Sequence, residues 1–205
     1  IVNAIEEDHN GNIWIGSTWG GLSIFDGKNF KIYNKENGLL ESGGVISICR
    51  GKNNQMIVAF KTGINIIEGK AISTFHNDIF ANHKISKLFR DKSGNVWILT
   101  DKTLFIYNGY SLVDLGHAFK IDFVFSAIAQ DKNGNIWLGT KGNGIFILEK
   151  SVGDKYVLIP YNKNEQLSRI QVQSILIDKE NNLWIGSDDF GIIKYDYKTL
   201  TFINQ

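Results

Sequence analysis

The chain contains one proline, one cysteine and one methionine among 205 residues: Pro160, Cys49 and Met56. A lone cysteine excludes an internal disulfide, and the apolar stretch that leads to it favours a buried thiol over a nucleophile. No apolar run is long enough to span a bilayer. The net charge of +1 gives no indication of a nucleic acid or a membrane surface as partner.

Helical periodicity and targeting segments are also missing. No window repeats apolar residues at helical spacing over several turns. The chain shows no signal peptide and does not begin with methionine, so we expect it to be a piece of a longer protein. What it has instead is glycine and aromatic residues: 21 Gly, 13 Phe, 7 Tyr and 5 Trp. This composition favours short strands joined by tight turns.

One phrase recurs along the chain, in the form Asp-x-x-Gly-Asn-x-Trp. Four copies keep both the aspartate and the tryptophan, and we call these the legible copies. They begin at Asp8, Asp91, Asp131 and Asp178 and contain Trp14, Trp97, Trp137 and Trp184. A degraded copy begins at Gly51, and we align Met56 with the tryptophan position. The steps between these five positions are then 42, 41, 40 and 47 residues. A period near forty residues is typical of repeat architectures.

Each repeat has the pattern of four short strands. In the first, the expected strands are Val2–Ile5, Ile13–Ile15, Leu22–Phe25 and Phe30–Tyr33. The Asn10-Gly11 pair between the first two strands predicts a tight hairpin, because both residues tolerate positive φ.

Repeated four-stranded units predict an all-β fold, a β-propeller of about five antiparallel blades within a single region, 1–205. The blades are expected near 1–40, 41–80, 81–120, 121–165 and 166–205. They form either a closed five-bladed ring or a segment of a larger, seven-bladed propeller. The repeated tryptophans are interpreted as packing between successive blades, because one blade is too small to bury its own faces. A β-sandwich gives no reason for a fixed period.

The phrase, followed by Gly-Leu or Gly-Ile, resembles the two-component regulator propeller repeat, and the likeness covers essentially the whole chain. The matching residues of blades one and four are Asp8, Gly11, Asn12, Trp14, Ile15, Gly16, Gly21, Leu22, Asp131, Gly134, Asn135, Trp137, Gly139, Thr140, Gly144 and Ile145. Blade five has Asn181 in place of glycine, blade three has Leu99 in place of glycine, and blade two departs most.

The resemblance implies a periplasmic, non-catalytic sensor region of a bacterial hybrid two-component system. It implies a carbohydrate or similar small polar ligand and no cofactor, nucleic acid or direct membrane contact. Members of this family continue into an immunoglobulin-like linker, a membrane span, a kinase and a regulator. Further blades, self-association and a dimer in the parent protein follow from the same resemblance.

Ligand residues are expected on the variable loops between the second and third strands, because loops on a rigid scaffold tend to carry function. Trp19 is the tryptophan outside the repeated phrase, and an aromatic ring beside carboxylates and amides suits a sugar. It and Phe190 could instead cap their own blades. The candidate residues are Thr18, Trp19, Lys61, Asp101, Lys141, Asn143, Asp188, Asp189 and Phe190.

Metal and catalytic sites are not expected. The turn from Asp131 to Asn135 lacks the carboxylates and closing glutamate of a calcium loop. The pair Asp188-Asp189 together with Asp101 could serve glycoside hydrolysis, but solvated turn residues are the favoured interpretation. The histidines (His9, His76, His83 and His117) share no metal-ligand spacing.

Two other functions stay open. A lyase or hydrolase similar to virginiamycin B lyase predicts clustered histidines and acids on the central-channel face. A protein-interaction scaffold like the WD-repeat propellers predicts no catalytic cluster.

Overall fold

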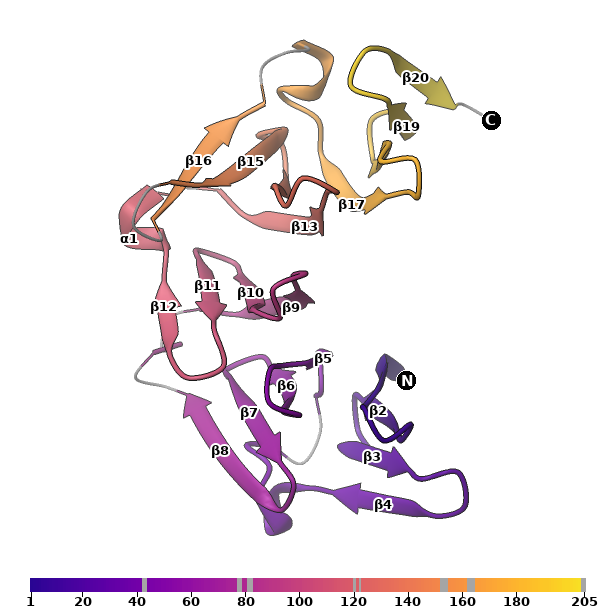
Figure 1. The fold of residues 1–205 in the computed structure, drawn as a ribbon, viewed down its shortest axis with the longest axis vertical. Coiled ribbons are helices and arrows are strands. Elements are labelled where there is room, and N and C mark those ends of the chain that lie inside the picture. Colours follow the sequence, from indigo (N-terminus) through magenta and orange to yellow (C-terminus); the bar gives the residue numbers. More distant parts are fainter. Residues whose placement is uncertain are drawn as a thin grey trace. The chain divides into compact units, whose positions relative to one another are not determined.

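Five four-stranded antiparallel sheets make up the chain (Figure 1). The computed structural model describes residues 1–41, 44–76, 79–80, 83–119, 121, 123–151, 155–161 and 165–203. Helix within these residues is limited to one short turn of α-helix, α1 (Gly116–Phe119), and two 3-10 turns, Lys35–Asn37 and Glu165–Leu167. The expected all-β class with five four-stranded sheets is therefore confirmed.

The chain divides into two compact units, Ile1–Leu115 (unit 1) and Gly116–Gln205 (unit 2). Unit 1 holds three sheets. Sheet 1 consists of β1 (Val2–Glu7), β2 (Ile13–Ser17), β3 (Leu22–Phe25) and β4 (Phe30–Tyr33). Sheet 2 consists of β5 (Ser47–Arg50), β6 (Met56–Phe60), β7 (Gly63–Glu68) and β8 (Ala71–His76). Sheet 3 consists of β9 (Ile85–Arg90), β10 (Val96–Thr100), β11 (Leu104–Tyr107) and β12 (Leu112–Asp114).

Unit 2 holds the other two sheets. Sheet 4 consists of β13 (Phe125–Gln130), β14 (Ile136–Thr140), β15 (Ile145–Lys150) and β16 (Tyr156–Pro160). Sheet 5 consists of β17 (Val172–Ile177), β18 (Leu183–Ser187), β19 (Gly191–Tyr195) and β20 (Leu200–Ile203). In all five sheets each strand pairs with the next one along the chain, so every sheet is a meander.

The first hairpin closes differently from the expected Asn-Gly turn. The backbone N–H of Gly11 donates to the carbonyl of Asp8, and the N–H of Asp8 donates to the carbonyl of Asn12. Gly11 has a φ of 82°, whereas Asn10 is not among the residues with positive φ. The expected hairpin is present, and of the pair only Gly11 uses the positive φ that both residues tolerate. The turn is a three-residue loop that ends on a left-handed glycine.

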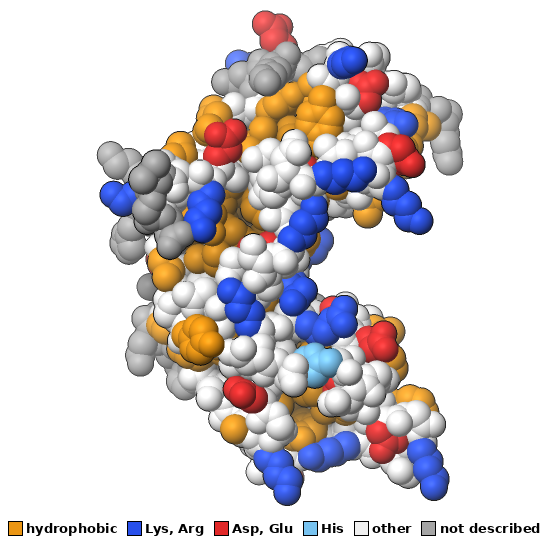
Figure 2. Space-filling model, in the orientation of Figure 1, with side chains coloured by type: hydrophobic (Ala, Val, Ile, Leu, Met, Phe, Trp, Pro, Cys, Tyr) orange, Lys and Arg blue, Asp and Glu red, His pale blue; other side chains and the backbone are white. Residues whose placement is uncertain are grey.

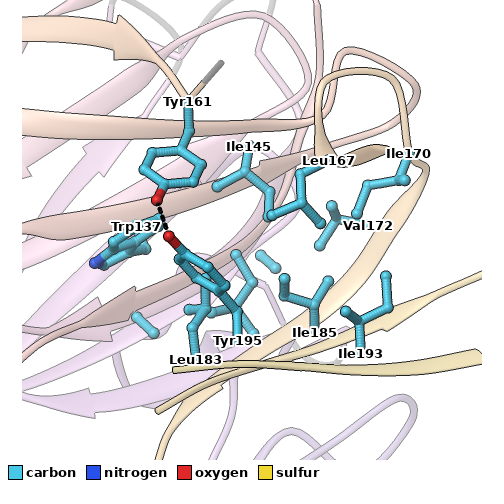
Figure 3. Close-up of a cluster of buried hydrophobic side chains, with 13 residues drawn as sticks. Trp137, Ile145, Tyr161, Leu167, Ile170, Val172, Leu183, Ile185, Ile193 and Tyr195 are labelled. Atoms are coloured by element: carbon cyan, nitrogen blue, oxygen red, sulfur yellow. Dashed lines mark hydrogen bonds between the residues drawn. The ribbon is translucent and has the colours of Figure 1, made fainter. Parts of the chain in front are cut away.

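Apolar side chains fill the space between successive sheets within each unit. Trp14, Leu22 and Tyr33 of sheet 1 lie in one cluster with Val45, just before sheet 2, and with Val58 of sheet 2. The second cluster of unit 1 joins sheets 2 and 3. In unit 2 a third cluster joins sheets 4 and 5 (Figure 3), where the hydroxyl groups of Tyr161 and Tyr195 are 2.6 Å apart. Packing of Trp14 and Trp137 against the following sheet agrees with the interpretation of the repeated tryptophan.

The alignment of Met56 with the tryptophans is wrong. Met56 pairs with Arg50 and packs with the residues of sheet 1, as part of the cluster between sheets 1 and 2. The next residue, Ile57, belongs to the cluster between sheets 2 and 3. Ile57 lies six residues after Gly51, the same step as from Asp8 to Trp14. Ile57 thus occupies the tryptophan position, facing the following sheet.

Candidate functional site

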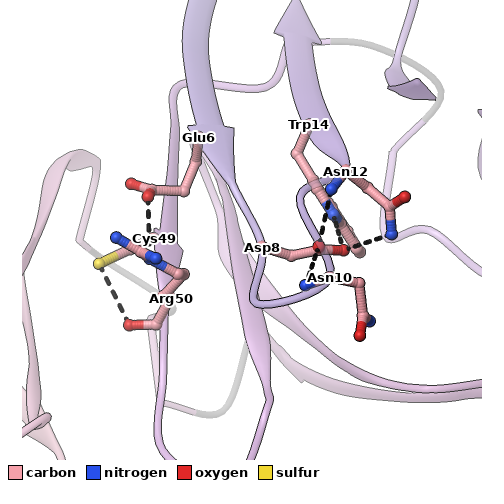
Figure 4. A network of polar contacts seen from close by, with 7 residues as sticks. All are labelled: Glu6, Asp8, Asn10, Asn12, Trp14, Cys49 and Arg50. Carbon is pink, nitrogen blue, oxygen red and sulfur yellow. Dashed lines mark hydrogen bonds and ion pairs between the residues drawn. The ribbon is translucent and has the colours of Figure 1, made fainter. Parts of the chain in front are cut away.

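The aspartate and the tryptophan of each legible copy are bonded to each other. In sheet 1, the indole Nε1 of Trp14 donates to Oδ2 of Asp8 at 2.9 Å, and Nδ2 of Asn12 donates to the same oxygen (Figure 4). The other carboxylate oxygen accepts from the backbone N–H groups of Asn10 and Asn12. Both oxygens of Asp8 are therefore used to hold its own hairpin and its own tryptophan.

The same contact recurs in sheets 3, 4 and 5. Its Nε1–Oδ2 distances are 3.0 Å for Trp97–Asp91, 3.0 Å for Trp137–Asp131 and 2.7 Å for Trp184–Asp178. Burial alone would raise the pKa of Asp8, but the hydrogen bonds from Trp14, Asn12 and the turn backbone hold it below its ordinary value. For Asp178 the same balance lowers the pKa to about 2. The repeated phrase is structural in all four copies.

The glycine of the phrase makes room for a valine at or just before the first strand of the following sheet. A Cβ added at Gly16 would lie 2.2 Å from Cγ1 of Val45, and one added at Gly139 would lie 2.3 Å from Cγ1 of Val172. Real Cβ atoms do not approach other atoms that closely. The two valines therefore fit only where the phrase has glycine.

Sheet 2 replaces both partners of the aspartate–tryptophan contact. Gly51 stands in place of the aspartate, and a Cβ there would lie 2.5 Å from Cδ1 of Ile57. Backbone bonds close this hairpin, from the N–H of Gly51 to the carbonyl of Gln55 and from the N–H of Gln55 to the carbonyl of Lys52. The Gln55 side chain links the turn to other strands instead: its Nε2 donates to Glu68 of β7 and its Oε1 accepts from the hydroxyl of Tyr107 in sheet 3.

Thr18, Trp19, Lys61 and Asp101 lie on the strand-two-to-strand-three loops of unit 1. The Trp19 side chain is 85% exposed. Oγ1 of Thr18 accepts from Nδ2 of Asn3, and Oδ1 of Asp101 accepts from the backbone N–H of Lys84 at 2.7 Å. Lys61 is exposed. No contact among the described residues joins one of these side chains to another.

The remaining candidates lie on the corresponding loops of unit 2. Lys141 and Asn143 are exposed. Asp188 accepts from Nε2 of Gln173 at 2.6 Å, and Asp189 accepts from the backbone N–H of Gln171 at 2.8 Å. The ring of Phe190 packs edge-on against Phe202 of its own sheet, with 5.4 Å between centroids. Their assignment as ligand residues stays a prediction.

Sequence reasoning missed a cleft at the opposite edge of unit 1. It lies between sheets 1 and 2, has a volume of about 570 Å³ and is lined by the hairpin turns of both sheets. Trp14, Ile24, Tyr33, Met56 and Ile67 form its apolar part, and polar side chains of the turns surround them. The degraded second copy was the available signal, because its turn differs from the others.

Two absences concern the described residues only. They contain no helix long and apolar enough to cross a membrane. They also contain no group of three or more His, Cys, Asp or Glu side chains placed to hold a metal ion. The side chains of His76 and His117 lie outside the described residues. Parts of the loops that join one sheet to the next lie outside them as well.

Three segments of the chain match the family described as two component regulator propeller: residues 1–19, 119–142 and 166–189. They contain the phrases of sheets 1, 4 and 5, the copies that have both tryptophan and the following glycine. Within these three segments the chain is similar to the two component regulator propeller repeat.

Solved structures show the same fold around these repeats. The chain is similar to the extracellular domain of BT4673 from B. thetaiotaomicron, described as a hybrid two component system, with a TM-score of 0.71 and 23% identity over 97% of this chain and 27% of that one. The corresponding domain of BT3049 gives a TM-score of 0.74 and 18% identity over 100% and 28%. The chain thus spans about a quarter of the length of these two structures.

Virginiamycin B lyase from Staphylococcus aureus has a TM-score of 0.71 and 12% identity over 99% of this chain and 69% of the lyase. At these identities the likeness shows the propeller fold alone. No curated protein sequence matches the chain.

Proposed function

We propose that the chain is a non-catalytic, extracytoplasmic ligand-sensing segment of a two-component signalling protein, and that it binds a carbohydrate or similar small polar ligand. The observation that carries this proposal is the match of three segments to two component regulator propeller repeats. The similar solved structures support an extracytoplasmic setting, because those of BT4673 and BT3049 are extracellular domains.

Trp19 is the residue on which we place ligand contact. Its loop is held by hydrogen bonds from the N–H of Ser17 to the carbonyl of Gly21 and from the N–H of Gly20 to Oγ of Ser17. The N–H of Gly44 donates to the carbonyl of Thr18 at 2.7 Å, which ties the loop to the segment before sheet 2. An exposed indole on a fixed backbone loses little freedom when a sugar ring stacks on it.

A non-catalytic role is supported by how the loop carboxylates are used. Asp101, Asp188 and Asp189 each accept a hydrogen bond from a residue just before or within the first strand of their own sheet. Carboxylates that hold backbone and amide groups in place fit a structural role better than a pair poised for glycoside hydrolysis.

A calorimetric titration with oligosaccharides tests the proposal. We expect Trp19→Ala to weaken binding at least tenfold while the melting temperature stays within about 1 °C of the wild type, because an exposed side chain contributes little to stability. Trp19→Phe keeps an aromatic face and serves as the matched control, with a smaller loss. A lower melting temperature without a binding defect would show that Trp19 caps its blade. No binding of any glycan would sink the sensor proposal itself.

A further inference from the structure

The first strands of sheets 1 and 2 are joined by an ion pair, with 3.2 Å between Nε of Arg50 and Oε1 of Glu6, while the cleft lies among the turns of the two sheets. Between sheets 2 and 3, Nζ of Lys52 donates to Asn95 and Nδ2 of Asn53 donates to the hydroxyl of Tyr110. Between sheets 4 and 5, the backbone N–H of Lys132 donates to Oδ1 of Asn181. Among the described residues, no hydrogen bond joins the turn Asp8–Asn12 of sheet 1 to Asn53 or Asn54 of sheet 2.

The altered turn of sheet 2 shapes the cleft. Asn53 and Asn54 have φ values of 51° and 63°, so both residues are left-handed, unlike any residue pair in the turn of sheet 1. The N–H of Gln55 donates to the carbonyl of Lys52, which places the two asparagines at the tip of the turn. Both line the cleft, opposite His9 and Asn10 of sheet 1.

The charged side chains of the cleft are engaged within the protein. Asp8 accepts from its own turn and from Trp14, and Oδ1 of Asp26 accepts from the N–H groups of Lys28 and Asn29. Oε2 of Glu68 accepts from Gln55. The ammonium group of Lys31 donates to the hydroxyl of Tyr33 and lies 4.5 Å from the centre of that ring. The hydrogen bonds to the carboxylates come from uncharged donors and do not cancel the charges: three carboxylates against one ammonium group leave the cleft acidic, which disfavours an anionic ligand.

The uncharged amides are available instead. In the part of the chain that the structure describes, the side chains of Asn10 and Asn54 take part in no hydrogen bond, although both line the cleft. Each offers donors and an acceptor, which complement hydroxyl groups. The buried rings of Trp14 and Tyr33 form the aromatic part of the cleft. Figure 2 shows apolar side chains recessed among polar ones in the lower part of the view.

We propose that this cleft binds a neutral polyhydroxylated ligand of one or two sugar rings, with the amides of Asn10 and Asn54 contacting its hydroxyls and the rings of Trp14 and Tyr33 its apolar face. The volume of about 570 Å³ suits a ligand of that size. The inference rests on the proposed sensing function, but it places a ligand at the opposite edge of the sheets from Trp19.

The test follows the indole N–H signals of the ¹⁵N-labelled chain during titration with N-acetylglucosamine, maltose, lactose and cellobiose. Trp14→Phe and Trp19→Phe variants assign two of the five signals. We expect the Trp14 signal to shift with at least one sugar, because Trp14 lines the cleft. A sugar that shifts Trp19 and leaves Trp14 unchanged would overturn the cleft site and leave the sensing function standing. No binding anywhere would remove both.

Two variants define the contacts. Asn10→Ala keeps the backbone N–H that Asp8 uses, and Asn54→Gly suits the left-handed backbone. Each should weaken the sugar about fivefold, the usual cost of one hydrogen bond, and together at least tenfold. Asn133→Ala is the matched control, since Asn133 has the same position in the turn of sheet 4. An equal loss in Asn133→Ala, or displacement of the sugar by choline, would contradict the inference.

Discussion

The aspartate and tryptophan of each legible repeat satisfy each other's hydrogen-bonding needs. Trp97 and Trp137 are only 1% exposed, so their indole N–H groups have no water to bond. A buried donor without a partner costs about 1 to 3 kcal/mol. The carboxylate removes that cost and at the same time closes the hairpin through the backbone N–H groups. Either residue alone would leave a buried polar group unsatisfied.

Sheet 2 allows this coupling to be measured. Gly51→Asp should destabilise the chain by about 1 to 3 kcal/mol, because the new Cβ meets Ile57 and the carboxylate gains no indole partner. Combining it with Ile57→Trp should be less costly than the sum of the two single changes, by about 1 kcal/mol. Urea denaturation of the four proteins of the cycle gives this coupling energy. Strict additivity would show that the two positions are independent.

The lowered pKa of the Asp178 carboxyl group predicts how the fifth repeat responds to acid. Its pKa in the folded protein is about 2, below its ordinary value of 3.8, so it adds stability above pH 3.8 that is lost as the pH falls through 2. We expect the Trp184 indole N–H signal, followed by NMR, to keep its hydrogen-bonded position down to about pH 3 and to change below it. In Asp178→Asn the signal should lack this titration step. A midpoint near 4 in the wild type would refute the lowered pKa.

At the scale of the element, the glycine that lies two residues after the tryptophan determines how closely one sheet packs against the next. A Cβ added at Gly139 meets Cγ1 and Cβ of Val172, the first residue of β17. Gly139→Ala should therefore cost about 1 to 3 kcal/mol in urea denaturation, and Val172→Ala should recover part of it. Gly186→Ala is the control: its Cβ meets mainly Oγ of Ser174, which can rotate away. Similar losses of stability in both variants would show that the close contact with Val172 is not what requires glycine at position 139.

The alternation of apolar and polar residues predicted the strands, and the glycine and asparagine residues between them marked the turns. It failed in β6, where Met56–Phe60 is buried on both faces. Alternation cannot tell which face is which in such a strand, and without Asp and Trp nothing anchored the register. The Asn10-Gly11 pair marked the first hairpin, but it did not reveal that Asp8 organises the turn through its side chain. Loop residues could be assigned to an edge. The altered second turn marked an irregularity in the repeats, but the cleft itself depends on how two sheets meet.

At the scale of the whole molecule, sheets 1 and 5 each expose apolar side chains on one face. Ile5, Phe30 and Ile32 of sheet 1 are 60–64% exposed, and Leu176 of sheet 5 is 63% exposed. Exposed apolar patches of this kind favour association. We expect the chain to self-associate with rising concentration in sedimentation velocity, and Ile32→Lys with Leu176→Lys to reduce it. Asn133→Lys, a change in the exposed turn of sheet 4, should have no effect. A monomer at all concentrations would contradict this.

The bond between aspartate and tryptophan also constrains how such repeats can diverge after duplication. A copy that loses one of the two residues first passes through a form in which the remaining carboxylate or indole has lost its hydrogen-bond partner. Selection against that intermediate preserves the pair, and Gly51 with Ile57 marks a copy in which both members have been replaced. Among related chains, the two positions should therefore change together, and the cleft beside the altered turn is the kind of novelty that such a joint replacement makes accessible.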